Sequence, residues 1–263
     1  MKRTLPLVLL AVILSACSSV LLTGRKQLNL VSDSEVLAMS LQSYKTFIDS
    51  VPISTNKTNT AMVKKVGTKI AAAVESYMKA NGHTADIANF AWEFNLVKDA
   101  QVNAFCMPGG KVVVYEGILP KTLTESGMAV VLGHEIAHAV ARHSNERISQ
   151  QMALQYGAAF TGILVSGKSA ATQSIVNTVY GLGAQAGIML PYSRKQEYEA
   201  DNLGLIFMAM AGYNPKESVT FWERMTADKS SSSVDFMSTH PSDSKRIAKL
   251  NEELPTALTY YKK

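Results

Sequence analysis

The chain has 263 residues, a hydrophobic content of 47% and a formal net charge of +5. This composition excludes a disordered tail, a collagen-like fibre and a disulfide-stapled miniprotein, because it supplies enough apolar side chains for one sizeable core and only 2 Cys. Lys and Arg are scattered along the chain without a basic run, so we expect no nucleic-acid partner.

The N-terminus is typical of a secretory signal, which we assign to residues 1–16. Lys2 and Arg3 precede an apolar stretch at 5–14 that is too short for a permanent membrane span. The Leu-Ser-Ala-Cys that follows resembles a bacterial lipobox, in which Cys17 becomes the lipidated first residue of the mature protein. The alternative is an ordinary signal peptide with an incidental Cys at its end.

Ser18, directly after that Cys, resembles an outer-membrane sorting signal. We therefore expect a bacterial envelope protein that a lipid on Cys17 anchors to the membrane, on the periplasmic face of the outer membrane. Lipidation would leave Cys106 as the lone thiol, which we expect to be a buried small side chain and not a nucleophile.

The first half of the mature chain predicts two helices followed by two strands. A tether of about fifteen residues leads into a helix at 32–50, and a second helix at 59–79 carries apolar side chains on one face. Residues 90–97 alternate between apolar and polar side chains as a strand does, and the turn at 108–110 leads into a second strand at 112–115.

From about residue 122 onwards the chain is predicted to be helical. The expected helices lie near 122–143, 145–166, 172–189, 193–211, 215–227 and 241–253. Apolar stretches in the second and third of these are short and interrupted by polar side chains, which favours a buried or amphipathic pair over membrane spans. The alternative is a pair that lies near the membrane surface or covers a cleft. The fold class is a mainly helical α+β domain with a small sheet.

The residues that indicate chemistry are His134-Glu135-Ile136-Ala137-His138, within an otherwise apolar helix. Histidines four apart project from one helix face, so His134 and His138 can bind one metal ion. Zinc suits this pair because it accepts two imidazoles and a carboxylate and keeps a fourth position for water. Glu135 is the expected general base, which takes a proton from water and delivers it to a leaving amine.

A third ligand must come from elsewhere in the chain. His143 follows His138 by five residues, whereas the metzincin pattern needs six, so it fails on spacing. Glu197 and Asp201 share one face of a later helix. We expect Glu197 to bind the metal, and Asp201 to accept a hydrogen bond from the outer N–H of a metal-binding imidazole.

This order of motifs, H-E-x-x-H and later E-x-x-x-D, resembles the gluzincin zinc peptidases. The surrounding sequence narrows the resemblance to the family of HtpX, the CAAX prenyl endopeptidases and the mitochondrial Oma-type proteases. The residues that carry it are Asn103-Ala104-Phe105, Pro108-Gly109-Gly110, Gly133, Glu199-Ala200-Asp201, Gly212-Tyr213-Asn214-Pro215, His240-Pro241 and Arg246-Ile247. The match covers about residues 60 to 250 and implies a zincin-like metallopeptidase domain. The lipobox and the lack of clear spans resemble the soluble, lipid-anchored bacterial branch.

The resemblance also assigns roles to single residues. Asn103, Ala104 and Phe105 match the edge of the family's active-site cleft, where an extended substrate pairs as an added strand; a purely structural hairpin is the alternative. His240 matches a region near the active site, where it either stabilises the oxyanion or binds the metal as an inhibitory fourth ligand. Arg246 either orients this segment and the carboxylates or forms a salt bridge without catalytic consequence.

These patterns together predict a zinc endopeptidase with one Zn²⁺ per chain that acts on misfolded or mislocalised envelope proteins. The expected division is a signal at 1–16, a lipidated tether and helix at 17–55, a metallopeptidase domain at 56–254 and a tail at 255–263. The alternative is a latent or gated peptidase that acts mainly as a chaperone-like binding factor at the outer membrane. A structural zinc site is disfavoured, because three protein ligands beside a Glu leave an open position.

Overall fold

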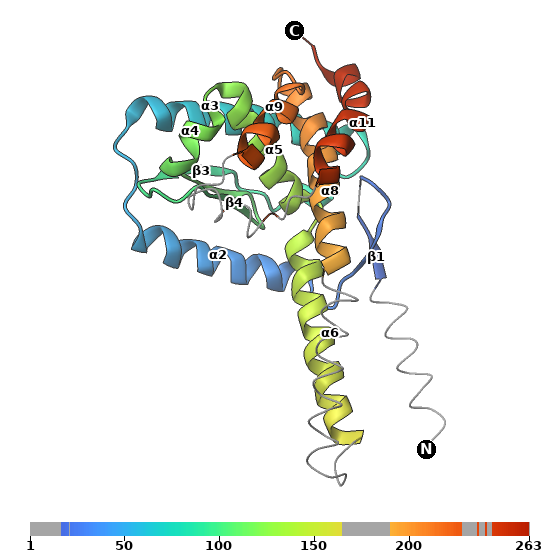
Figure 1. The fold of residues 1–263 in the computed structure, drawn as a ribbon. Coiled ribbons are helices and arrows are strands. Elements are labelled where there is room, and N and C mark those ends of the chain that lie inside the picture. The colour runs from blue at the N-terminus through green and yellow to red at the C-terminus, as the bar shows by residue number, and fades with distance from the viewer. Residues whose placement is uncertain are drawn as a thin grey trace. The chain divides into compact units, whose positions relative to one another are not determined.

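The computed structural model describes residues 17–20, 22–164, 190–227, 236, 240 and 244–262 (Figure 1). The chain divides into two compact units. The first unit comprises Met1–Val36 and Arg142–Lys195, and the second comprises Leu37–Ala141 and Gln196–Lys263. The predicted signal and the predicted helix at 172–189 lie outside the described residues.

The second unit contains a three-stranded sheet in the order β3-β5-β4. The parallel pair is β3 (Glu93–Val97) and β5 (Lys111–Tyr115), and β4 (Ala104–Met107) runs antiparallel to β5. The predicted strands at 90–97 and 112–115 are present as β3 and β5, whereas the side-chain pattern did not predict β4, and only the family resemblance indicated an extended edge there. Among the described strands, β4 lies at one edge of this sheet.

Two long helices cover opposite faces of the sheet (Figure 1). Helix α2 (Asp33–Ser50) packs Tyr44 and Phe47 against β5 and β4, with the Phe47 and Phe105 ring centroids 5.3 Å apart. Helix α3 (Lys57–Ala80) packs on the other face, where Phe94 fills the space left by the missing side chain of Gly67. A short 3-10 helix, η1 (Thr84–Ile87), leads from α3 towards the sheet.

Helix α5 (Glu125–Val140) is the central helix, with every residue from Gly127 to Val140 buried. It follows η2 (Glu116–Ile118) and α4 (Leu119–Thr122). The prediction of one helix at 122–143 was wrong in detail, because Leu123 has a φ of 60° and interrupts it. The Thr124 hydroxyl then accepts a hydrogen bond from the Gly127 N–H at 3.1 Å and caps the new helix.

Three further helices surround α5: α8 (Leu190–Met210), α9 (Glu217–Ala227) and α11 (Ser244–Tyr260). Two of them differ from the sequence prediction. Helix α8 begins three residues before the predicted Ser193, and α11 continues through Pro255 to Tyr260, so most of the predicted tail is helical. Gly212, with a φ of +83°, follows the end of α8 and allows the chain to reverse.

Helices α5 and α8 cross at two glycines. A Cβ atom on Gly204 would lie 2.9 Å from the His134 nitrogen, and a Cβ atom on Gly133 would lie 2.9 Å from the Gly204 oxygen. Both distances are shorter than ordinary van der Waals contact, so a side chain at either position would force the helices apart. This crossing brings the H-E-x-x-H motif of α5 against the face of α8 that carries Glu197 and Asp201.

The first unit joins a β-ribbon to α6 (His143–Leu164). The ribbon pairs β1 (Cys17–Ser19) antiparallel to β2 (Lys26–Leu28), within the segment predicted as a tether. The Arg25 guanidinium forms two hydrogen bonds, of 2.9 and 2.7 Å, with the buried Glu146 carboxylate of α6. Strands of three residues are too short for sequence periodicity to reveal.

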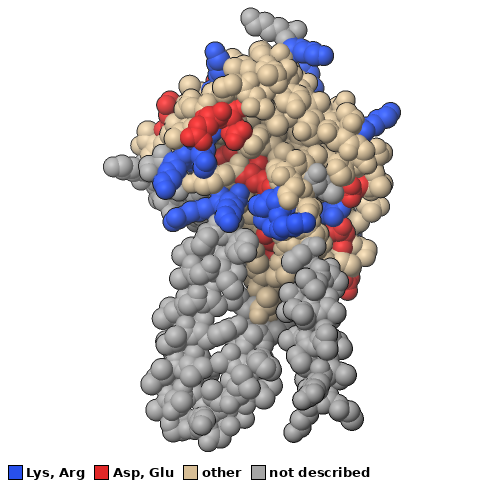
Figure 2. Space-filling model, turned by 90° about the vertical axis from the view of Figure 1, so that its right-hand side faces the viewer, with Lys and Arg blue, Asp and Glu red and all other residues tan. Residues whose placement is uncertain are grey.

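No helix in the described part of the chain is long and apolar enough to cross a membrane. Charged side chains of both signs lie beside one another on the face drawn in Figure 2. Individual ion pairs in the second unit include Lys65 with Glu125 and Lys45 with Asp49, each at 2.7 Å. Such exposed pairs contribute little to stability.

The helix crossing generates a prediction. Ala at position 204 would raise the helix propensity of α8, but its methyl group would meet the backbone at Gly133 and His134. We therefore expect Gly204→Ala to lower the free energy of unfolding by about 1–3 kcal/mol, as overpacked cores do. Urea unfolding followed by circular dichroism measures this difference, and an equal or higher midpoint would contradict the tight crossing.

Candidate metal centre

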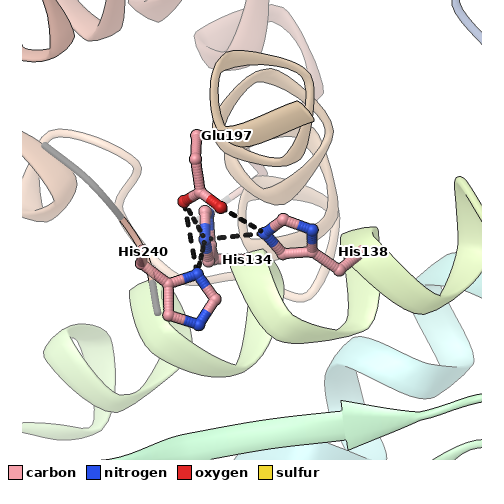
Figure 3. Close-up of side chains that lie close together, drawn as sticks. All are labelled: His134, His138, Glu197 and His240. Atoms are coloured by element: carbon pink, nitrogen blue, oxygen red, sulfur yellow. Dashed lines mark hydrogen bonds and ion pairs between the residues drawn. The ribbon is translucent and has the colours of Figure 1, made fainter. Parts of the chain in front are cut away.

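Two histidines of α5 lie one helical turn apart and turn their rings towards one point (Figure 3). The His134 Nε2 and His138 Nε2 atoms are 3.0 Å apart. Both residues are buried, with 2% and 9% of their surface exposed. Their position follows from the i, i+4 spacing, which was the basis for predicting them as a pair.

Glu197 of α8 and His240 complete the cluster (Figure 3). The Glu197 Oε2 atom lies 3.2 Å from His134 Nε2, and Glu197 Oε1 lies 3.4 Å from His138 Nε2. The His240 Nδ1 atom lies 3.2 Å from both His134 Nε2 and Glu197 Oε2. One ligand atom from each of the four residues lies within 4.8 Å of the others.

These four residues fit a metal ion better than they fit a hydrogen-bond network. The His134 Nε2 atom has three close neighbours within the cluster, yet an imidazole nitrogen carries at most one proton and can donate to only one of them. Ligand atoms around a tetrahedral Zn²⁺ lie about 2.0–2.1 Å from the ion and hence about 3.4 Å from one another. The separations of 3.0 to 3.4 Å among atoms of His134, His138 and Glu197 agree with that requirement, and the ligand atoms of all four residues lie within 4.8 Å of one another.

A second layer of charged groups holds His134 in place. The Asp201 Oδ1 atom lies 2.9 Å from His134 Nδ1, the ring nitrogen that faces away from the cluster. Arg246 donates to both oxygens of Asp201 at 2.7 Å, and its Nη1 atom forms an ion pair with Glu197 at 3.4 Å. From the sequence, Asp201 was expected beside a metal-binding imidazole, and Arg246 was expected either to orient the carboxylates or to form a salt bridge without catalytic consequence. Nothing in the sequence indicated that Arg246 is fully buried.

The charge distribution favours a cation within the cluster. Burial alone would lower the pKa of His134, but the carboxylates of Asp201 and Glu197 outweigh it and raise this pKa to about 9. Burial likewise opposes ionisation of Glu197, yet the neighbouring imidazoles hold its pKa well below the usual range. The carboxylates therefore stay ionised, and they favour positive charge between them.

Glu135 lies beside the cluster without joining it. Its carboxyl group is buried, and its Oε1 atom lies 3.3 Å from His240 Nε2. The two nitrogens of His240 therefore face different partners, because Nδ1 approaches the candidate ligand atoms and Nε2 approaches Glu135. Both roles predicted for His240 require this closeness to the centre.

The predicted substrate-binding residues lie at the start of β4, the edge strand that contacts α5. Asn103 accepts a hydrogen bond from the Ala104 N–H at 2.9 Å, and Phe105 turns to the sheet face covered by α2. Cys106 is buried as predicted, and burial together with the nearby Glu135 charge raises its pKa well above the usual value. Cys17 pairs with Leu28 in the ribbon of the first unit.

Two aromatic residues near the centre were missed by the sequence analysis. The ring of Phe236 stacks on His240 with centroids 4.7 Å apart, and the ring of Trp222 lies 6.1 Å from that of His134. Neither residue belongs to a metal or catalytic motif, so nothing in the sequence distinguished them from ordinary core aromatics.

Comparison with known proteins gives relatives with named activities. The chain is 41% identical over 173 residues to mitochondrial metalloendopeptidase OMA1 of Schizosaccharomyces pombe, a match covering 65% of this chain and 49% of the relative. It is 27% identical over 245 residues to the mitochondrial metalloendopeptidase OMA1 of Homo sapiens, covering 90% and 46%. A beta-barrel assembly-enhancing protease of Yersinia pestis is 32% identical over 166 residues, covering 60% and 33%.

The chain spans between a third and about half of the length of the curated relatives it matches. The family profile described as "Peptidase family M48" matches residues 64–254. This range contains α5, α8, His240 and Arg246 and covers well over half of the chain. The mainly helical α+β fold predicted from the sequence agrees with this assignment, and the chain belongs to peptidase family M48.

Proposed function

We propose that the protein is a zinc-dependent endopeptidase whose metal is held by His134, His138 and Glu197. The observation that carries the proposal is the convergence of buried imidazole nitrogens and a carboxylate beside a further buried carboxylate, that of Glu135. Nitrogen and oxygen ligands of this kind suit Zn²⁺. The metalloendopeptidase names of the relatives support the same reaction class.

When bound, zinc supplies a Lewis acid that polarises the scissile carbonyl and acidifies water. Glu135 takes the proton from the attacking water and delivers it to the nitrogen of the leaving amine. Asp201 and Arg246 keep His134 oriented, since they fix the ring nitrogen that faces away from the cluster. Their burial excludes water that would compete for the same hydrogen bonds.

The substrate in this proposal is a polypeptide bound in an extended conformation along β4. An edge strand can pair with an added strand, and β4 lies against the helix that carries Glu135. Asn103, Ala104 and Phe105 line the start of this edge. A bound backbone would present its carbonyl groups alongside the H-E-x-x-H helix.

The physiological setting that we propose is the bacterial envelope, with misfolded or mislocalised envelope proteins as substrates. The lipobox before Cys17 supports lipid anchoring at the periplasmic face of the outer membrane. A relative named for enhancing β-barrel assembly supports a role in the envelope, although other relatives are named as mitochondrial. The division into a signal at 1–16, an anchored segment at 17–55 and a peptidase domain at 56–254 is part of the same proposal.

The roles of Glu135 and Glu197 can be separated by matched substitutions. Glu135→Gln should keep zinc and lose proteolysis by about 10²–10⁴-fold, because the amide cannot accept the proton. Glu197→Gln should lose zinc itself. Metal analysis measures the zinc content of each variant, and cleavage of labelled casein measures its proteolysis. Wild type treated with a chelator is the inactive reference. Retained proteolysis in Glu135→Gln would contradict the mechanism. If cells with Glu135→Gln show a milder envelope defect than cells that lack the protein, the result would favour the alternative in which the protein acts mainly as a binding factor.

His240 lies where a fourth protein ligand would close the coordination shell. If its Nδ1 atom occupies the position needed by water, His240→Ala should raise casein turnover severalfold at saturating zinc and weaken zinc binding. The variant must be assayed at several zinc concentrations so that the two effects separate. A fall in kcat with unchanged KM and zinc affinity would instead assign His240 to stabilising the oxyanion.

The anchoring proposal predicts where the protein fractionates. Cys17→Ser removes the thiol that would carry the lipid, so the variant should move from the membrane fraction to the soluble fraction. Cys106→Ser is the matched control, because this buried thiol lies far along the chain from the signal and should not affect fractionation. Identical membrane association of wild type and Cys17→Ser would contradict lipidation.

A further inference from the structure

Trp222 of α9 is buried beneath the charged groups that hold His134. Only 1% of its surface is exposed, and the Arg246 Cζ atom lies 3.4 Å from the centroid of its ring. Arg246 itself is 0% exposed, so its guanidinium group lies entirely within the protein. The two side chains come from different helices, α9 and α11.

A buried guanidinium group is stable only if both its edge and its faces have suitable neighbours. The edge of Arg246 donates to Asp201 at 2.7 Å through two nitrogens and reaches Glu197 through the third. Its faces carry no N–H groups and cannot form hydrogen bonds. An indole ring suits a face, because it covers the group and attracts the cation through its π electrons.

These contacts form a continuous series from Trp222 to the metal ligands. The indole fixes the plane of Arg246, the plane sets the direction of the two hydrogen bonds to Asp201, and Asp201 fixes His134 Nδ1. We propose that Trp222 is a positioning residue of the metal centre, which sets metal affinity by holding the Arg246 guanidinium group in the plane that Asp201 and Glu197 require. This inference rests on the proposed metal site and extends it to a residue that supplies no ligand atom, although its ring also lies edge-on to that of His134, with centroids 6.1 Å apart.

A first experiment separates positioning from simple core packing. Trp222→Leu removes the ring face, whereas Trp222→Phe keeps a smaller one. Phe221→Leu is the matched control, because Phe221 is also fully buried and is the neighbouring residue of the same helix. Zinc affinity is measured by chelator competition at a temperature below the unfolding midpoint of each variant. It should fall roughly tenfold in Trp222→Leu and much less in Trp222→Phe and Phe221→Leu. Equal losses in Trp222→Leu and Phe221→Leu, or no loss in either, would overturn the inference.

A second experiment holds the size of the ring nearly constant and therefore remains decisive if Trp222→Leu does not fold. The chain has 2 Trp, so a Trp92→Phe background allows fluorinated tryptophans to enter at position 222 alone. Each added fluorine withdraws electron density from the ring face and weakens its attraction for the guanidinium group. Zinc affinity should fall stepwise with fluorine number, and the visible spectrum of the Co²⁺-substituted protein should shift, at an unchanged unfolding midpoint.

The control for fluorination is the reciprocal protein, Trp222→Phe with fluorinated Trp92. Its zinc affinity should not depend on fluorine number, because Trp92 donates to Glu75 and does not contact Arg246. If the wild type binds zinc and fluorination of Trp222 does not change the zinc affinity, the positioning role is overturned while the metal site stands. Absence of zinc binding by the wild type would instead overturn the proposed function.

Discussion

The close crossing of α5 and α8 is the constraint on which the candidate site depends. His134 and His138 lie on one helix and Glu197 and Asp201 on the other, so the four side chains converge only if the two backbones nearly touch. Gly133 and Gly204 allow this approach, since a Cβ atom on either would meet the opposite backbone at 2.9 Å. Glu197, Asp201 and Gly204 follow one another at spacings of four and three and therefore share a helix face. The same face thus forms both the contact and the site.

The sequence predicted the residue pairs that depend on helical spacing and missed two helix boundaries at which the chain departs from ordinary residue preferences. The pairs His134 with His138 and Glu197 with Asp201 follow from helix periodicity, and the order of motifs indicated that the two pairs belong together. The break at Leu123 escaped prediction, because an exposed leucine with positive φ has no sequence signature. The continuation of α11 through Pro255 also escaped, because proline ordinarily ends a helix.

The balance of buried charge favours both the guanidinium group of Arg246 and a cation at the candidate metal centre. Glu135, Glu197 and Asp201 are buried, and Arg246 is the guanidinium group that contacts two of them. Glu197 and Asp201 are ionised, and with Glu135 also ionised, as the proposed base requires, three carboxylates beside one guanidinium would leave an excess of negative charge. Uncompensated buried charge is costly. Neutral imidazoles supply lone pairs but no compensating charge. A divalent cation between the imidazoles and Glu197 would remove most of the excess, whereas protonation of His134 removes part of it.

The ring of His240 lies between the candidate metal ligands and Glu135. Its Nδ1 atom lies among the candidate ligand atoms while its Nε2 atom lies 3.3 Å from Glu135, so one ring contacts both the metal position and the proposed base. A tetrahedral ion with three histidines and Glu197 as ligands would have no position left for water. Phe236 stacks on this ring and also contacts Trp222, whose indole covers Arg246. One aromatic pair, Phe236 and Trp222, therefore packs against both His240 and Arg246.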